Sequence, residues 1–142
     1  MNYLNDFEKK YKSDVNLIKS FNSWNWILRP NQTSFASTIL YHKSNKKRLS
    51  DITEQDFNEF KLVVNFIEKI YSNKTSYFQL NYLALMMVDP IVHFHIIPRY
   101  SKSIFFQDLE FKDYSFPKPP DLSLYNNVTD SVKKKIIKYL KS

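Results

Sequence analysis

Two of the three histidines in the chain, His93 and His95, lie two residues apart in the segment DPIVHFHIIPRY, residues 89–100. The β-branched and aromatic content of this segment predicts a strand over residues 91–97 that Pro98 ends. Because side chains alternate between the two faces of a strand, the two imidazoles would project from one face about 6–7 Å apart. The opposite, apolar face would carry Val92, Phe94 and Ile96.

Two imidazoles at this spacing can lie against one phosphoryl group. His93 could attack phosphorus, because a neutral imidazole is nucleophilic, while His95 donates a hydrogen bond to the phosphate or to its leaving oxygen. Two alternatives use the same residues: ordinary half-buried histidines, or metal ligands, since His-x-His on a strand is also a common metal-binding spacing. A metal site would need further ligands, for which His42 and Asp89 are the evident candidates, and neither completes a known spacing. We predict no metal site.

The composition favours one globular domain over residues 1–142. The chain is 43% hydrophobic and 17% aromatic, which excludes a disordered protein. No apolar run is long enough to span a membrane, and the N-terminus has no secretory signal pattern, so we expect no membrane association. The absence of cysteine excludes disulfides and thiolate chemistry, and a cytoplasmic location is expected.

The net charge of +7 favours anionic partners such as nucleotides or nucleic acids, although general over-use of lysine explains the charge equally simply. Lys133–Lys135 would form a solvated helix face. The chain contains no glycine, which excludes glycine-rich phosphate loops. Its tight turns must then use Asn, Asp, Ser or Pro.

The elements that would position the histidines follow from hydrophobic periodicity and from Pro and polar turn signals. Helices are predicted over residues 3–11, 53–71 and 128–140, with Ser50 and Thr53 as the two candidate N-caps of the long helix. Strands are predicted over residues 23–28, 35–42, 77–88 and 91–97. The order indicates an α+β fold, with an antiparallel sheet of about five strands and the long helix packed on it. Trp24 and Trp26 would lie in the core or a dimer interface, with base stacking as the alternative, and His42 would be exposed.

With Pro98-Arg99 fixing the register, the segment resembles the signature of the histidine triad (HIT) family, in which three histidines alternate with apolar residues. The resemblance covers about residues 21–100, with a C-terminal extension over 101–142. It implies that His93 is the nucleophile and that His95 contacts the phosphate. Ile91 replaces the first histidine. In the family the backbone carbonyl at that position orients the nucleophilic ring, and Ile91 retains this carbonyl.

The same resemblance suggests substrate-binding residues by position. Asn81 matches a polar residue that contacts phosphate. Arg29 lies near a ribose-binding position and suggests a phosphate contact instead. Ser37 lies near another family site residue, and Gln32 could reach the pocket. Residues 86–88 replace the family's Gly-Gln-Ser/Thr stretch, so the leaving-group site must differ.

The implied function is that of a nucleotide hydrolase or nucleotidyl transferase. It would act at an α-phosphate through a nucleotidyl-His93 intermediate, on dinucleoside polyphosphates or related conjugates, as a homodimer. No cofactor is implied, although a divalent cation could accompany a polyphosphate substrate. The alternatives are a nucleotide-binding or regulatory protein that has lost turnover, and a factor that processes nucleic-acid ends.

Overall fold

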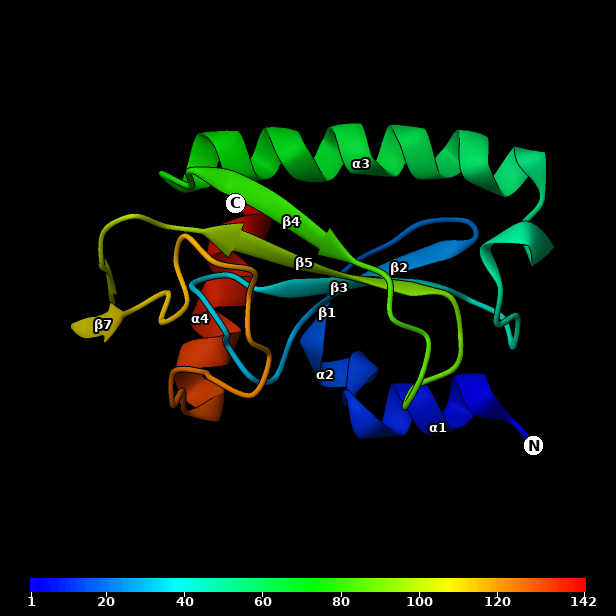
Figure 1. The fold of residues 1–142 in the computed structure, drawn as a ribbon, viewed down its shortest axis with the longest axis horizontal. Coiled ribbons are helices and arrows are strands. Elements are labelled where there is room, and N and C mark those ends of the chain that lie inside the picture. Colours follow the sequence, from blue (N-terminus) through cyan, green and yellow to red (C-terminus); the bar gives the residue numbers. More distant parts are fainter.

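The computed structural model describes all 142 residues as a five-stranded antiparallel sheet with helices on both of its faces (Figure 1). The strand order is β1-β2-β3-β5-β4, and every neighbouring pair is antiparallel. The strands are β1 (Leu17–Ser20), β2 (Trp24–Leu28), β3 (Thr38–His42), β4 (Gln79–Leu83) and β5 (His93–Arg99). The helices are α1 (Tyr3–Lys10), α2 (Ser13–Asn16), α3 (Glu54–Lys74) and α4 (Asp130–Lys141), with a 3-10 turn, η1, at Leu49–Asp51. The predicted α+β class and five-stranded sheet are confirmed.

The two faces of the sheet pack against different helices. One face, which carries Trp24, Trp26, Val92 and Ile96, forms the main core together with apolar residues of α3 and α4. The other face forms a smaller cluster of Phe7, Tyr11, Ile27, Ile39, Tyr41 and Ile91, in which Phe7 lies in α1 and Tyr11 is the residue directly after it. Both tryptophans are fully buried in the main core, as expected for core residues. The alternation along β5 therefore places His93 and His95 under α1.

The long helix α3 begins after Thr53, one of the two candidate N-caps, and ends three residues past the predicted end. The Thr53 side chain accepts a hydrogen bond from the backbone N–H of Asp56, which satisfies one of the donors left free in the first turn. Near the other end, the buried Tyr71 hydroxyl donates to the carbonyl of Ala36 at 2.6 Å. These contacts fix α3 across the sheet at both ends.

The prediction that His42 is exposed is wrong. Its side chain is buried, with Nε2 2.6 Å from Oδ2 of Asp56 and Nδ1 2.7 Å from Oγ of Ser44. The first turn of α3 thus reaches the end of β3, a contact between segments far apart in sequence. His42 therefore ties α3 to the sheet and lies outside the histidine pair.

The predicted strand over residues 77–88 is too long, because β4 ends at Leu83. The following apolar residues, Leu85, Met87 and Val88, are 57%, 82% and 83% exposed. The sequence prediction also missed β1 and the hairpin of β6 (Ile104–Phe106) and β7 (Leu109–Phe111). These three strands have only three or four residues each, too short for a clear alternation of polar and apolar residues.

The left-handed backbone positions differ from the expected turn chemistry. Positive φ angles occur at Lys12, Ala36, Met86, Gln107 and Asp108. Only Asp108 belongs to the four residue types predicted for the turns. Without glycine, the chain therefore places residues with a Cβ in a region that ordinarily disfavours them.

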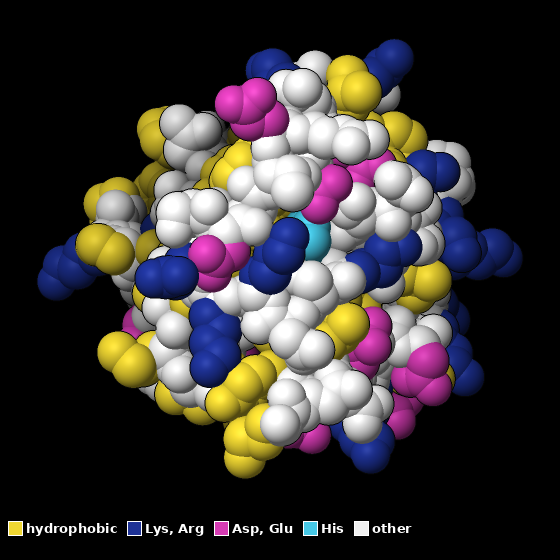
Figure 2. All heavy atoms as spheres, turned by 90° about the vertical axis from the view of Figure 1, so that its right-hand side faces the viewer, with side chains coloured by type: hydrophobic (Ala, Val, Ile, Leu, Met, Phe, Trp, Pro, Cys, Tyr) yellow, Lys and Arg dark blue, Asp and Glu magenta, His cyan; other side chains and the backbone are white.

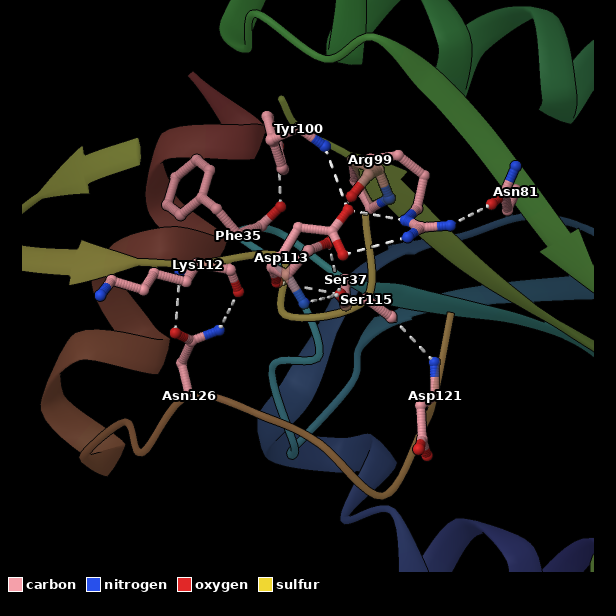
Figure 3. Close-up of polar contacts among 12 residues, drawn as sticks. Phe35, Ser37, Asn81, Arg99, Tyr100, Lys112, Asp113, Ser115, Asp121 and Asn126 are labelled. Carbon is pink, nitrogen blue, oxygen red and sulfur yellow. Dashed lines mark hydrogen bonds and ion pairs between the residues drawn. The ribbon is translucent and has the colours of Figure 1, made fainter. Parts of the chain in front are cut away.

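The C-terminal extension packs onto the sheet through a buried ion pair (Figure 3). Asp113 Oδ2 accepts from Nε of Arg99 at 2.7 Å, and Oδ1 accepts from Nη2 at 3.1 Å. Asn126 donates to the carbonyls of Gln32 and Lys112, both at 3.0 Å. Asp113 and Asn126 thus connect residues 101–142 to the segments around Gln32 and Arg99. No helix in the structure combines the length and the apolar character needed to cross a bilayer.

Candidate active site

The candidate active site is the pair of imidazoles at the start of β5. The rings of His93 and His95 have centroids 5.0 Å apart. Their cross-strand neighbours on β3 are Tyr41 and Ile39, respectively, so the two rings lie over the middle of the sheet. Strand pairing on both sides of β5 fixes the backbone of the two histidines. The chemistry of the pair therefore depends on which ring nitrogens carry a proton.

The proton position on His93 follows from one hydrogen bond. Nδ1 of His93 lies 2.7 Å from the carbonyl oxygen of Ile91, and a carbonyl can only accept, so Nδ1–H donates. The proton is then absent from Nε2, whose lone pair remains available. Burial lowers the pKa of His93, which favours this neutral form. The Ile91 carbonyl thus makes the contact to the His93 ring that the resemblance implied, although the side chain of Ile91 is not an imidazole.

The proton position on His95 is the opposite. Nε of Arg29 lies 3.3 Å from Nδ1 of His95, and a guanidinium can only donate. Nδ1 of His95 must therefore accept, which places the ring proton on Nε2. Burial, and then the positive charges of Arg29 and of a protonated His93, lower the pKa of His95 to about 3. The pair therefore presents one nucleophilic Nε2 and one hydrogen-bonding Nε2–H.

The N-terminal helix closes this face of the sheet. The ring of Phe7 lies 5.1 Å from that of His93, and the ring of Tyr11 lies 6.4 Å from that of His95. The two histidine residues are 2% and 4% exposed. Figure 2 shows one end of the molecule, whose surface carries interspersed Lys or Arg, Asp or Glu and hydrophobic side chains.

One carboxylate binds two side chains at the C-terminal end of α1. Asp89, in the loop before β5, accepts from Nζ of Lys10 at 2.8 Å and from the hydroxyl of Tyr11 at 2.7 Å. These two contacts join segments that lie almost 80 residues apart in sequence. Burial, followed by the hydrogen bond to Asp89, raises the pKa of Tyr11, so the hydroxyl remains a donor at neutral pH. We refer to Lys10, Tyr11 and Asp89 as the α1 latch.

Asn81 belongs to a different network from the histidines. Its Oδ1 accepts from Nη1 of Arg99 at 2.8 Å (Figure 3). Asn81 lies opposite Ile97, two cross-strand pairs beyond the Leu83–His95 pair. Asp113 holds the same guanidinium from the other side. Asn81 therefore helps to hold the arginine that binds Asp113 of the C-terminal extension.

Ser37 and Gln32 brace the loop that carries Arg29. Nε2 of Gln32 donates to the carbonyls of Arg29 at 2.6 Å and Ser37 at 2.9 Å, and Oε1 accepts from the Ser37 N–H at 3.2 Å. The Ser37 hydroxyl accepts from the N–H of Ser34 and donates to its carbonyl. Both residues are fully buried. Among the four predicted substrate-binding side chains, Arg29 alone makes a hydrogen bond to a histidine of the pair.

Sequence reasoning missed Phe7 and Tyr11 as residues of the site. Their spacing in the predicted helix indicated a buried stripe, but the stripe did not reveal which surface it covers. The structure contains no group of three or more His, Cys, Asp or Glu side chains placed to hold a metal ion.

Neither a protein-family model nor a curated protein matches the sequence. Solved structures do match. A histidine triad protein from Marinobacter aquaeolei VT8 superposes with a TM-score of 0.73 at 14% identity, over 94% of this chain and 90% of that one. One from Bradyrhizobium japonicum gives a TM-score of 0.71 at 15% identity, over 88% and 87%. A diadenosine triphosphate hydrolase from Plasmodium falciparum gives 0.63 at 12% identity, over 98% and 94%. The chain therefore has the fold of the histidine triad proteins.

Proposed function

We propose that the protein is a histidine triad enzyme that hydrolyses or transfers nucleotides at the α-phosphate, with a nucleotidyl-His93 intermediate. The observation that carries this proposal is the opposite protonation of the two rings. A lone pair on Nε2 of His93 and a proton on Nε2 of His95 are what an attack on phosphorus requires from two neighbouring groups.

The reaction would proceed in two displacements. In the first, Nε2 of His93 forms a bond to the α-phosphorus as the bond from phosphorus to the bridging oxygen of the leaving group breaks. His95 donates its Nε2–H to a phosphate oxygen that gains charge in this step. In the second, water forms the new phosphorus–oxygen bond, the phosphorus–nitrogen bond breaks, and the water's proton is released. AMP and free His93 result when the substrate is an adenine nucleotide.

Substrate can reach His93 only after the aromatic cover moves. Phe7 and Tyr11 occupy the space in front of the two rings, and the α1 latch holds the helix that carries them. In this proposal, the nucleotide displaces these side chains as it binds, so closed and open arrangements of α1 alternate during turnover.

The proposal is tested by incubating the protein with diadenosine polyphosphates and adenosine 5′-phosphoramidate and measuring AMP release. His93→Ala and His93→Asn should abolish release, while circular dichroism shows that both variants fold. A radiolabelled adenylyl group should become attached to the wild-type chain alone, through an acid-labile, base-stable bond. Release of AMP by the His93 variants at the wild-type rate would refute the proposal.

A second candidate is a nucleotide-binding protein without turnover, and the closed histidine face favours it. If α1 remains over the rings when nucleotide binds, the protein would bind AMP but release none from any substrate. Calorimetric binding together with absent turnover would identify this function. Strong salt-dependent binding to oligonucleotides would instead support a factor acting on nucleic-acid ends.

We also propose that the chain forms a homodimer. The edge strand β4 leaves one side of its backbone unpaired. Tyr82 in this strand and Phe78 directly before it are exposed, and these features favour association with a second sheet. Sedimentation equilibrium would show a dimer, and Tyr82→Lys should shift the population toward monomer.

A further inference from the structure

Three side chains at the junction of β3 and α3 form a hydrogen-bonded series that the proposed function does not use. Nδ1 of His42 lies 2.7 Å from Oγ of Ser44, and Nε2 of the same ring lies 2.6 Å from Oδ2 of Asp56. Ser44 is in the loop after β3, and Asp56 is in the first turn of α3. A hydroxyl, an imidazole and a carboxylate in this order are the groups that activate a serine for nucleophilic attack. We refer to Ser44, His42 and Asp56 as the Ser44 cluster.

The hydrogen bonds of the Ser44 cluster determine where its protons lie. The hydrogen bond from His42 lowers the pKa of Asp56, so the carboxylate is ionised at neutral pH and accepts from Nε2–H. Nδ1 of the neutral ring is then an acceptor, and the hydroxyl of Ser44 donates to it. An imidazole takes up a proton through either nitrogen, so His42 is placed to remove the serine proton.

The Ser44 cluster is held in place before any substrate binds. The ring of Trp24 packs edge-on against that of His42, with centroids 4.9 Å apart. The hydroxyl of Ser23 donates to Oδ1 of Asp56 at 2.9 Å, so both carboxylate oxygens are fixed. His42 is buried, whereas Ser44 is partly exposed. A substrate can therefore approach the serine from solvent while the imidazole remains shielded from it.

The loop around Ser44 also supplies positive charge and a backbone donor. The N–H of Lys46 donates to Oγ of Ser44 at 3.2 Å, and the N–H of Asn45 makes no hydrogen bond within the chain. A donor beside the nucleophile stabilises the oxyanion that forms when a carbonyl is attacked. Three lysines of the loop form no ion pair and add to this stabilisation, namely Lys43, Lys46 and Lys47.

We propose that the Ser44 cluster is a second reactive centre, which hydrolyses activated carboxylic esters through an acyl-Ser44 intermediate. Oγ of Ser44 forms a bond to the carbonyl carbon while its proton moves to Nδ1 of His42. The bond from this carbon to the leaving oxygen then breaks, and the leaving oxygen takes the proton as an alcohol. Water next forms a bond to the acyl carbon and gives a proton to Nδ1. Oγ leaves with that proton, which releases a carboxylic acid and restores Ser44.

The nucleophile is tested in the His93→Ala background, because the imidazole of His93 is itself a nucleophile. A fluorophosphonate probe should label Ser44, as located by peptide mass spectrometry, and 4-nitrophenyl acetate should be hydrolysed. Ser44→Ala should abolish the labelling and lower the hydrolysis rate at least about 100-fold. The matched control is Ser123→Ala, which removes an exposed hydroxyl that donates to a carboxylate but contacts no histidine. Absence of label on Ser44, or equal hydrolysis by Ser44→Ala, would overturn the proposal.

The part played by His42 and Asp56 is tested with a thiol, since the chain contains no cysteine. At pH 7 the thiol of Ser44→Cys should react with iodoacetamide about tenfold faster than that of Ser123→Cys, because His42 removes its proton. Adding Asp56→Asn should remove this advantage, because an amide N–H can donate to Nε2 and leave the ring proton on Nδ1. Circular dichroism checks that each variant folds.

Equal reactivity of the two thiols would show that the Ser44 cluster only attaches α3 to the sheet, and the proposal would fail. The outcome is independent of the histidine pair on β5. Ser44→Ala should leave any AMP release by the wild-type protein unchanged, so the proposed function and the reactive serine can be refuted separately.

Discussion

Nε of Arg29 lies 3.3 Å from Nδ1 of His95, and this contact determines which nitrogen of the ring carries a proton. The arginine approaches from the loop after β2, and Gln32 holds that loop by accepting from and donating to its backbone. Arg29 also donates from Nη1 to the carbonyl of Asn31 at 2.8 Å and to the hydroxyl of Thr33 at 3.1 Å. The guanidinium is thus fixed before any substrate binds.

Replacement of this guanidinium should change both the titration and the activity of the pair. In Arg29→Met the pKa of His95 should rise, because the variant removes a neighbouring positive charge, and the rate of nucleotidyl transfer should fall about 100-fold as the proton position becomes free. NMR titration of the imidazole protons and single-turnover kinetics measure the two effects. Thr33→Val, which removes one loop contact but leaves Nε in place, serves as the control. An unchanged His95 pKa in Arg29→Met would contradict this account.

Weakening of the α1 latch should expose the histidines. Asp89→Asn removes the carboxylate that holds Lys10 and Tyr11, so amide hydrogen exchange should accelerate in α1 and remain unchanged in α3. Modification of His93 and His95 by diethyl pyrocarbonate should accelerate with it. Asp51→Asn, which removes an exposed ion pair with Arg48, provides a charge-matched control. Wild-type protection of α1 in Asp89→Asn would show that its other contacts, such as apolar packing and the hydrogen bond from Tyr41 to Glu8, are sufficient to hold the helix.

The ion pair between Arg99 and Asp113 should contribute strongly to stability. The two side chains are 5% and 1% exposed, and Asp113→Asn would leave a buried guanidinium without its counter-charge. We expect a loss of about 3–5 kcal/mol in the free energy of unfolding, measured by urea denaturation. The exposed pair of Arg48 and Asp51 should contribute less than about 1 kcal/mol in the same assay. A loss below that of the exposed pair would show that Asn81 alone satisfies Arg99.

Acid should destabilise the protein through the buried histidines. The pKa of His95 falls from 6.5 to about 3 on folding, and that of His93 also falls, so the unfolded chain binds more protons below pH 6.5. Stability is therefore retained above pH 6.5 and lost as the pH falls toward 3, by at most about 1.4 kcal/mol per pH unit for each histidine. Urea denaturation between pH 7 and pH 4 should show a shallower decline for His95→Phe than for the wild type. Parallel declines would mean that other groups, such as carboxylates common to both chains, cause the loss.

The sequence predicted the parts of the site that depend on local periodicity. The two-residue alternation around His93 and His95 correctly separated the histidine face of β5 from its core face. The Thr53 N-cap likewise followed from a local rule and located the start of α3. Each pattern lies within one helix or strand, so each could be predicted without knowing which other elements pack against it.

The remaining features depend on contacts between distant segments. The apolar stripe of α1 indicates a buried face, but nothing local shows that the histidines lie beneath it. The apolar residues after Leu83 suggested a longer buried strand, yet β4 is an edge strand and its continuation is exposed. Asn81 was predicted to contact a substrate, but its side chain accepts a hydrogen bond from Arg99. Asp113 of the C-terminal extension holds the same arginine, and nothing in the sequence around Asn81 indicates this distant contact.

The aromatic cover over the histidines has a consequence for the thermodynamics of ligand binding. Phe7 and Tyr11 already exclude water from the sheet surface in the unliganded chain. A nucleobase that takes their place therefore exchanges one buried ring for another and removes little additional apolar area from water. We expect the heat capacity of binding to stay close to zero, in contrast to the strongly negative value that accompanies filling of a hydrated apolar pocket.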